Sequence, residues 1–151
     1  MAGDGVEIQP LLPAADAARR VALGARGTET VLLAEDEPSV RSPVRRILAA
    51  CGFRVLEAGD GATALKIAEG HAGTIDLLLT DVVMPGMNGS ELARRLRGMR
   101  SGVRVVFMSG YSTEAIASHG ALSPGSTFLQ KPFTISELTT RLRAALDVEP
   151  A

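Results

Sequence analysis

Acidic residues follow two apolar segments of this sequence, at the point where each segment ends. Glu35 and Asp36 come directly after VLLA, and Asp81 comes directly after LLLT. Carboxylates that share one cleft repel each other and raise each other's pKa values, unless a cation lies among them. Mg²⁺ suits such a set, because it usually takes few protein carboxylates, keeps waters and bridges to a phosphate oxygen. The three acids therefore predict a Mg²⁺ site, provided that the fold brings them together.

A hydroxyl group and an ammonium group follow two further apolar segments. Ser109 comes after VVFM, and Lys131 comes after TFLQ. A hydroxyl donor and a positive charge opposite a metal can neutralise the equatorial oxygens of a transferred phosphoryl group while an oxygen nucleophile attacks in line. Asp81 is the natural nucleophile, because a carboxylate can form an acyl phosphate. Each residue alone is compatible with a cap, a turn or a surface charge, but together they predict phosphoryl transfer.

The elements that must position these residues alternate between strands and helices along the chain. Apolar runs indicate the strands, and helical periodicity with capping residues indicates a helix after each one. Such alternation calls for a doubly wound α/β fold with a parallel sheet and right-handed crossovers. The second and fifth strands look least buried and belong at the edges, which predicts a five-stranded sheet in the order 2-1-3-4-5. The predicted strands are 30–34, 53–58, 75–80, 103–108 and 127–130.

Local signals in the predicted helices lead to further expectations. Pro43 falls inside the first helix, so we expect a kink or a locally broken first turn there. Capping-box spacing occurs at 88–91 and at 134–137, before the third and the last helix. Met99 shares a helical face with two leucines of the third helix and is expected in the core. The fourth helix, which would start after Ser112, has the weakest pattern in the chain.

Length and composition limit the classes of protein to which this chain can belong. Its 151 residues suit one domain, which we predict at 30–147, after a linker or disordered segment 1–29 and before a tail 148–151. An extra packed helix within the first segment is the alternative. The formal net charge of −1 gives no electrostatic reason to expect nucleic acid as a partner. We find no apolar run of the roughly 20 residues that span a membrane and no signal peptide. With Cys51 as the only cysteine, a reducing cytoplasmic location is expected.

Residues 30–146 resemble the receiver domains of two-component signalling, the CheY-like family. The resemblance implies that a phosphohistidine, on a sensor histidine kinase or a histidine phosphotransfer protein, donates its phosphoryl group to Asp81. It also implies that Ser109 and Lys131 contact the acyl phosphate, and that the peptide between Lys131 and Pro132 is cis. The motifs that carry the resemblance are VLLAEDEP, LLLTDVVMPGMNG, VVFMSGY and FLQKPF.

The same resemblance implies a set of metal ligands and a switch. Ser109 and Phe128 would move after phosphorylation and change the surface formed by the fourth helix, the fifth strand and the last helix. Phe128 stands where the family often has tyrosine, so its ring can rotate but cannot donate a hydrogen bond. The implied Mg²⁺ ligands are Glu35, Asp36, Asp81 and the backbone carbonyl of Val83.

The motifs MSGY and FLQKPF are similar to those of receivers fused behind the ATP-binding domain of hybrid sensor histidine kinases. The start of the chain also resembles the end of such a domain and its linker. A receiver catalyses its own phosphorylation but turns over no metabolite, so its status as an enzyme stays open. Two other functions also stay open. A Mg²⁺-dependent phosphatase with an aspartyl nucleophile would need a second acid and a substrate-covering cap, and we find neither. An inactive receiver that only binds proteins would not need all the active-site positions to be filled.

Overall fold

The five apolar runs of the sequence form five parallel strands in one sheet. The computed structural model describes residues 29–110 and 127–147. The strands are hydrogen-bonded in the order β2-β1-β3-β4-β5, so β1 and β3 are neighbours in the interior and β2 and β5 form the edges. This confirms the predicted fold class and strand order. The strands are β1 (Thr30–Ala34), β2 (Arg54–Ala58), β3 (Leu77–Asp81), β4 (Arg104–Ser109) and β5 (Thr127–Gln130).

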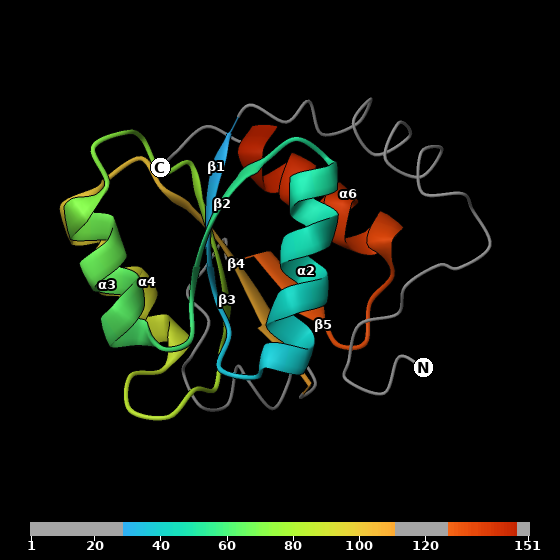
Figure 1. The fold of residues 1–151 in the computed structure, drawn as a ribbon, viewed down its shortest axis with the longest axis horizontal. Coiled ribbons are helices and arrows are strands. Elements are labelled where there is room, and N and C mark those ends of the chain that lie inside the picture. Colours follow the sequence, from blue (N-terminus) through green and yellow to red (C-terminus); the bar gives the residue numbers. More distant parts are fainter. Residues whose placement is uncertain (1–28, 111–126, 148–151) are drawn as a thin grey trace.

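Helices cover both faces of the sheet. Figure 1 shows α3 and α4 on one face and α2 and α6 on the other. The predicted fourth helix, together with segments 1–28 and 148–151, lies outside the described residues, so the expectations for these parts stay predictions. In the part of the chain that is described, the helices are α2 (Pro38–Ala50), α3 (Gly61–Gly70), α4 (Gly89–Met99) and α6 (Ile135–Asp147). None of these described helices combines the length and the apolar character that crossing a membrane requires.

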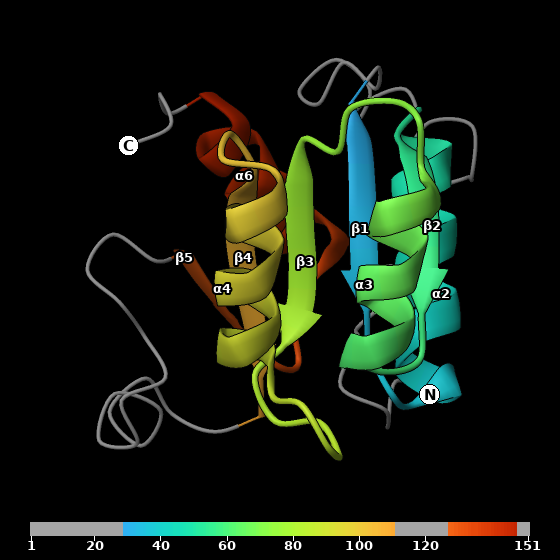
Figure 2. The same ribbon diagram turned by 90° about the vertical axis from the view of Figure 1, so that its left-hand side faces the viewer.

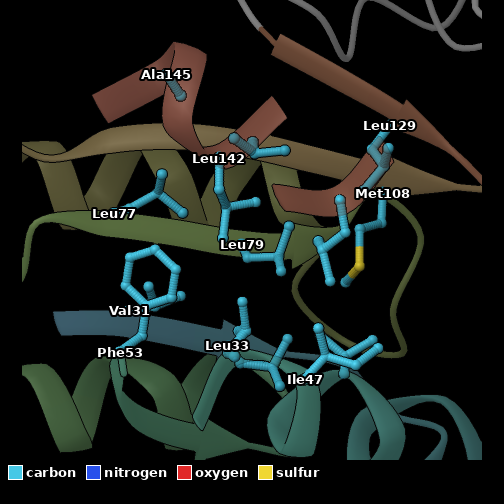
Figure 3. Packing of buried hydrophobic residues seen from close by; sticks show 14 of the residues in the cluster. Val31, Leu33, Ile47, Phe53, Leu77, Leu79, Met108, Leu129, Leu142 and Ala145 are labelled. Atoms are coloured by element: carbon cyan, nitrogen blue, oxygen red, sulfur yellow. The ribbon is translucent and has the colours of Figure 1, made fainter. Parts of the chain in front are cut away.

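Side chains alternate along the central strands between two hydrophobic clusters. In β1, Val31 and Leu33 belong to the cluster that packs under α2 and α6, whereas Leu32 and Ala34 belong to the cluster under α3 and α4. Figure 3 shows the first cluster filling the space between the sheet and its two helices. Because both faces of the sheet are covered, the middle residues of the central strands are mostly apolar and show no polar alternation. The edge strand β2 differs, since its Arg54 and Glu57 are exposed.

Two strands extend one residue further at their carboxyl ends than predicted. The expected strands 75–80 and 103–108 are observed at 77–81 and 104–109, so Asp81 and Ser109 are the last residues of β3 and β4. The backbone N–H of Val82 donates to the carbonyl of Met108, 2.9 Å away. The neighbouring strand thus supplies hydrogen-bond partners for one residue more than the apolar run indicated. As a result, both functional side chains start from rigid backbone.

Side-chain caps fix the starts of three helices, largely as predicted. Asp60 Oδ1 accepts from the backbone N–H of Thr63 at 2.7 Å at the start of α3. The predicted capping box at 134–137 is confirmed by its two reciprocal hydrogen bonds, of 2.8 and 3.0 Å. The one at 88–91 is half correct. Asn88 Oδ1 accepts from the N–H of Glu91 at 2.8 Å, but the Glu91 carboxylate pairs with arginines instead of reaching back.

The expectations of a broken first turn at Pro43 and of a buried Met99 are wrong, whereas a kink at Pro43 stays a prediction. The first turn of α2 is intact, because the N–H of Arg41 donates to the carbonyl of Glu37 at 2.9 Å and this bond needs nothing from Pro43. A broken first turn is therefore excluded, and α2 continues through Pro43 to Ala50. Met99 is 43% exposed instead of buried. It is the last residue of α4, and a side chain at a helix end has packing partners on one side only.

Candidate functional site

The carboxyl ends of the strands meet at one edge of the sheet, and the predicted site residues lie there. In Figure 2 the arrows of β1, β2 and β3 point toward the same edge. The register between β1 and β3 places Glu35 beside Asp81, and the register between β3 and β4 pairs Asp81 with Met108, the residue before Ser109. One carboxylate oxygen from each of Glu35, Asp36 and Asp81 lies within 4.8 Å of the others. The fold therefore brings together the acids that the sequence placed on separate strands.

Glu35 is the most deeply buried of the three acids, with no exposed surface. Its Oε1 accepts a hydrogen bond from Lys131 Nζ at 2.8 Å, and its Oε2 accepts from the backbone N–H of Glu37 at 3.1 Å. Both carboxylate oxygens of Glu35 are thus engaged within the protein. The sequence reasoning identified Glu35 and Lys131 but missed their direct pairing, which joins the ends of β1 and β5.

Lys131 bridges two of the acids. Its Nζ lies 2.8 Å from Glu35 Oε1 and 3.4 Å from Asp81 Oδ2, and its side chain is only 13% exposed. Burial lowers the pKa of Lys131, but the hydrogen bond to Glu35 and the charges of Asp81 and Glu35 outweigh this effect and leave the pKa above its ordinary value. Lys131 is therefore positively charged. Its backbone N–H donates to the Ser109 carbonyl at 2.8 Å, which fixes its main chain beside the end of β4.

Asp81 has a perturbed acidity. Its pKa is raised from 3.8 to about 6, chiefly because burial disfavours the ionised carboxylate and secondly because Glu35 repels it. The positive charge of Lys131 only partly offsets these effects. Lys131 contacts two of the three clustered carboxylates, so among the described residues the site carries an excess of negative charge.

Gly89 closes the loop that follows Asp81. The N–H of Gly89 donates to the carbonyl of Val82 at 2.8 Å, and a side chain at Gly89 would collide with the main-chain oxygen of Asp81. Only glycine allows the start of α4 to approach the end of β3 so closely. The sequence reasoning did not single out Gly89. The signal was an Asn-Gly pair in which asparagine caps a helix and glycine begins it.

The other predicted residues lie around this centre. Ser109 is 1% exposed at the end of β4, and Val83 lies in the loop after Asp81 with its side chain 54% exposed. Phe128 on β5 is half-buried and packs against the cluster under α3 and α4. The peptide between Lys131 and Pro132 is cis, as the resemblance implied. The roles of the Val83 carbonyl and of the Phe128 ring stay predictions.

Comparison with known proteins identifies the family. Residues 31–143 match the response regulator receiver domain family. The chain belongs to this family. Its receiver domain is 40% identical over 121 residues to the sensor kinase CckA of Brucella abortus, a match that covers 80% of this chain and 13% of that protein. It is 34% identical over 117 residues to the sensory transduction protein RegX3 of Mycolicibacterium smegmatis, covering 78% of this chain and 50% of that protein. The chain thus spans half or less of these relatives.

Solved receiver structures share the fold. The receiver domain of the hybrid histidine kinase CckA is 46% identical, with a TM-score of 0.66, and the match covers 78% of this chain and 99% of that one. The response regulator TrrA of Thermotoga maritima, solved in complex with Mg²⁺-BeF, is 27% identical with a TM-score of 0.66, covering 79% of this chain and all (100%) of that one. This chain is therefore a phosphoacceptor domain of two-component signalling, and its similarity to a hybrid-kinase receiver is confirmed.

The acidic cluster of this receiver domain fits a hard divalent cation. Glu35, Asp36 and Asp81 offer only oxygen donors, which Mg²⁺ and Ca²⁺ prefer. Burial and the charge of Glu35 raise the pKa of Asp81, and a bound cation would favour the ionised carboxylate against both effects. Receiver domains in general bind Mg²⁺ and interact with histidine kinases or phosphotransfer proteins. The residues present here are compatible with both properties.

Proposed function

We propose that Asp81 is the phosphoacceptor of this receiver domain and that it takes its phosphoryl group from a phosphohistidine of a sensor histidine kinase or a histidine phosphotransfer protein. An oxygen of the Asp81 carboxylate attacks phosphorus, the P–N bond of phosphohistidine breaks, and the imidazole keeps the bonding electrons. The observation that carries this proposal is the arrangement of Asp81 at the end of β3, with Lys131 Nζ 3.4 Å from its Oδ2 and two further acids beside it.

The surrounding residues have distinct roles in the proposed transfer. Lys131 neutralises charge on the phosphoryl oxygens, and the Ser109 hydroxyl donates to one of them. The proposed Mg²⁺ ligands are Glu35, Asp36, Asp81 and the backbone carbonyl of Val83. When bound, Mg²⁺ would supply further neutralisation of the phosphoryl charge and offset repulsion among the acids. Because Lys131 already pairs with Glu35, it is held in place before the phosphoryl group arrives.

The output of the proposed switch is a change at the surface of β5 and α6 and of the segment between β4 and β5. Phosphorylation adds a charge of about −1.5 to −2, which biases the Ser109 hydroxyl toward the phosphoryl group and lets Phe128 follow. Two features support this. Phe128 is only half-buried, and its carbonyl accepts from Arg141 Nη1 of α6 at 3.0 Å, which couples β5 to the last helix.

The proposal includes the setting of the domain. We place the receiver at 30–147, preceded by a linker or disordered segment, within a cytoplasmic hybrid histidine kinase. The similarity to the receiver of CckA supports this assignment. Cys51 is buried, and burial raises the pKa of its thiol to about 11. A thiol that is protonated and inaccessible stays reduced and unreactive.

Incubation with a small phosphodonor such as phosphoramidate and Mg²⁺, followed by intact-mass measurement, tests the proposal. The wild type should gain one phosphoryl group, and Asp81→Asn should gain none. Asp60→Asn is the matched control, because Asp60 is an exposed helix cap and asparagine caps equally well. A phosphoryl group retained by Asp81→Asn would contradict the assignment of Asp81. A wild type that gains none would favour an inactive receiver, and continuous phosphate release from unrelated monoesters would favour a phosphatase.

A further inference from the structure

Arg41 connects the outer surface of the domain to the loop that carries two of the acids. From the first turns of α2, its Nη1 donates a hydrogen bond to the main-chain carbonyl of Glu35 at 2.7 Å. Its Nε donates to Glu57 Oε1 on the edge strand β2 at 3.3 Å. The Arg41 guanidinium therefore lies between a carboxylate at the surface and the backbone at the end of β1.

The bond to the Glu35 carbonyl also bears on Asp36. The carbonyl of Glu35 and the nitrogen of Asp36 belong to one planar peptide unit. A hydrogen bond that fixes this carbonyl therefore also fixes the position of the Asp36 nitrogen. It restricts the direction in which the chain leaves β1. The other backbone bond at this point runs from the N–H of Glu35 to the carbonyl of Ala58 at 3.1 Å and lies on the preceding side of the residue.

The surroundings of Arg41 hold its guanidinium in this position. The side chain of Arg41 is 22% exposed, compared with 41% for Glu57. A side chain at Gly59 would come within 3.2 Å of Arg41 Nη1, so the small residue there leaves room for the guanidinium. The planar guanidinium can donate to the carbonyl and to Glu57 at the same time through different nitrogens, which a lysine ammonium on a flexible stem does less well.

We propose that Arg41 is a positioning residue for the cation site, which fixes the peptide between Glu35 and Asp36 and so directs the Asp36 carboxylate, with Glu57 holding Arg41 in place. The inference rests on the proposed function, because it assumes that Mg²⁺ binds at these acids. Arg41 does not contact the cation itself. It acts through the backbone, in the way that hydrogen-bond partners orient the ligands of other metal sites.

Mg²⁺ affinity and stability without metal, measured on the same variants, separate positioning from a structural role. Mg²⁺ dissociation constants come from NMR shifts of backbone amides, and stability comes from urea unfolding in chelator. We expect Arg41→Gln to weaken Mg²⁺ binding about tenfold, the lower end of the effects seen when orienting partners of metal ligands are removed. Arg41→Lys should lie between Arg41→Gln and the wild type.

Arg45→Gln is the matched control. Arg45 lies one turn further along α2 and also pairs with Glu57, at 3.2 Å, so its replacement removes the same charge and a bond to the same partner. Its Mg²⁺ affinity should equal that of the wild type within about twofold, since the bond from Arg41 to the Glu35 carbonyl is kept. Glu57→Gln should weaken Mg²⁺ binding, and less so when Arg41 has already been replaced.

Each outcome decides the inference. Arg41→Gln that is destabilised in chelator but binds Mg²⁺ like the wild type would show a purely structural role and overturn it. Loss of a positive charge near the site should by itself strengthen Mg²⁺ binding, so equal weakening in Arg45→Gln would assign the effect to the lost pairing with Glu57 and also overturn the inference. If Arg41→Gln does not fold, Arg41→Lys decides in the same way. A wild type that does not bind Mg²⁺ contradicts the proposed function together with this inference, whereas normal binding by the wild type and by both Arg41 variants overturns only the inference.

Discussion

Two groups of charged side chains in this receiver domain contain similar ion pairs but have opposite electrostatics. On α4, Glu91 Oε2 accepts from Arg94 and Arg95, each at 2.7 Å. These hydrogen bonds lower the pKa of Glu91. At the strand ends, Lys131 Nζ lies 3.4 Å from the Asp81 carboxylate, yet the pKa of Asp81 is raised to about 6. A nearby opposite charge therefore does not by itself lower the pKa of a carboxyl group.

Burial and charge balance explain the opposite pKa shifts. On α4 the two arginines are more than half exposed and outnumber the acid, so water and cations both favour ionised Glu91. At the strand ends three acids lie together, Lys131 contacts only two of them, and burial is the largest cause of the raised Asp81 pKa. Perturbed acids of this kind concentrate where proteins bind ions or carry out chemistry. The comparison teaches that ion pairs on α4 are surface features, whereas the pairs around Lys131 belong to a binding site.

The largest difference in stability between the two groups is expected when Lys131 is replaced. Lys131→Ala should destabilise the metal-free protein by about 3 kcal/mol, because it leaves the buried Glu35 carboxylate without its cation. Arg95→Ala removes a partner of similar distance from Glu91 and should change stability little. Urea unfolding in chelator measures both effects. Equal losses in the two variants would show that burial does not separate the two groups.

Titration of Asp81 should make the stability of the metal-free protein depend on pH. Below about pH 4 the carboxyl is protonated in both folded and unfolded states and contributes nothing. Between about pH 4 and 6 the unfolded chain ionises while the folded protein, with a pKa of about 6, keeps its proton, so stability falls as pH rises. Above pH 6 the full destabilising effect is present, about 1 to 2 kcal/mol once screening by solvent reduces the roughly two-unit difference between about 6 and 3.8.

Urea unfolding of the metal-free wild type and of Asp81→Asn checks this expectation at about pH 4.5 and about pH 7, one below and one above the folded-state pKa of Asp81. The stability difference between the two proteins should grow with pH, because only the wild type ionises Asp81. A difference that is independent of pH would mean that Asp81 is ionised in the folded protein at both values. Glu91 should behave oppositely, since its lowered pKa contributes stability that is lost as pH falls.

Asp81→Asn should stabilise the metal-free protein at pH 7 by about 1 to 2 kcal/mol. The substitution removes a buried negative charge from a repelling set, while loss of the contact with Lys131 limits the gain. Added Mg²⁺ should raise the melting temperature of the wild type more than that of the variant. Glu91→Gln is the contrasting control and should not stabilise. A clear loss of stability in Asp81→Asn would show that hydrogen bonds to the carboxylate outweigh the repulsion.

The smallest effect is expected at Val83, which lies between the buried site and solvent. Its exposed side chain offers no hydrogen bond to a water that could attack the acyl phosphate of Asp81. Val83→Asn could orient such a water and should accelerate self-dephosphorylation several-fold, which corresponds to less than about 1.4 kcal/mol. The measurement is the decay of phosphorylated protein after donor removal at constant Mg²⁺. Identical decay in both proteins would show that this side chain does not control water access.

Much of the fold and of the site could be predicted because the signals are local. Apolar runs, a two-residue alternation between two cores and caps such as Asp60 depend on neighbours within a few residues. Once the strand order follows from edge and centre patterns, the parallel arrangement places Glu35, Asp36 and Asp81 at one edge. The position of the acids thus followed from periodicity and topology together.

What failed locally had a physical cause beyond the pattern. The spacing at 88–91 matches a capping box, but Glu91 has two arginines within reach on its own helix and pairs with them. Met99 has the right periodicity for the core but stands where α4 ends. Helical periodicity predicts which face of the helix a residue occupies, but it does not predict whether another element covers that face.

By itself, the sequence determined the strands, the helix starts, the sheet order and the residue types gathered at its edge, because each of these depends on short-range periodicity and steric rules. Only the tertiary structure decided which charges pair. The hydrogen bond from Lys131 to Glu35 joins residues 96 positions apart, and that from Arg41 to the Glu35 carbonyl depends on how α2 packs beside β1. The energies of such pairs depend on distances and burial that exist only after folding, so the acidity of Asp81 is a property of the folded chain.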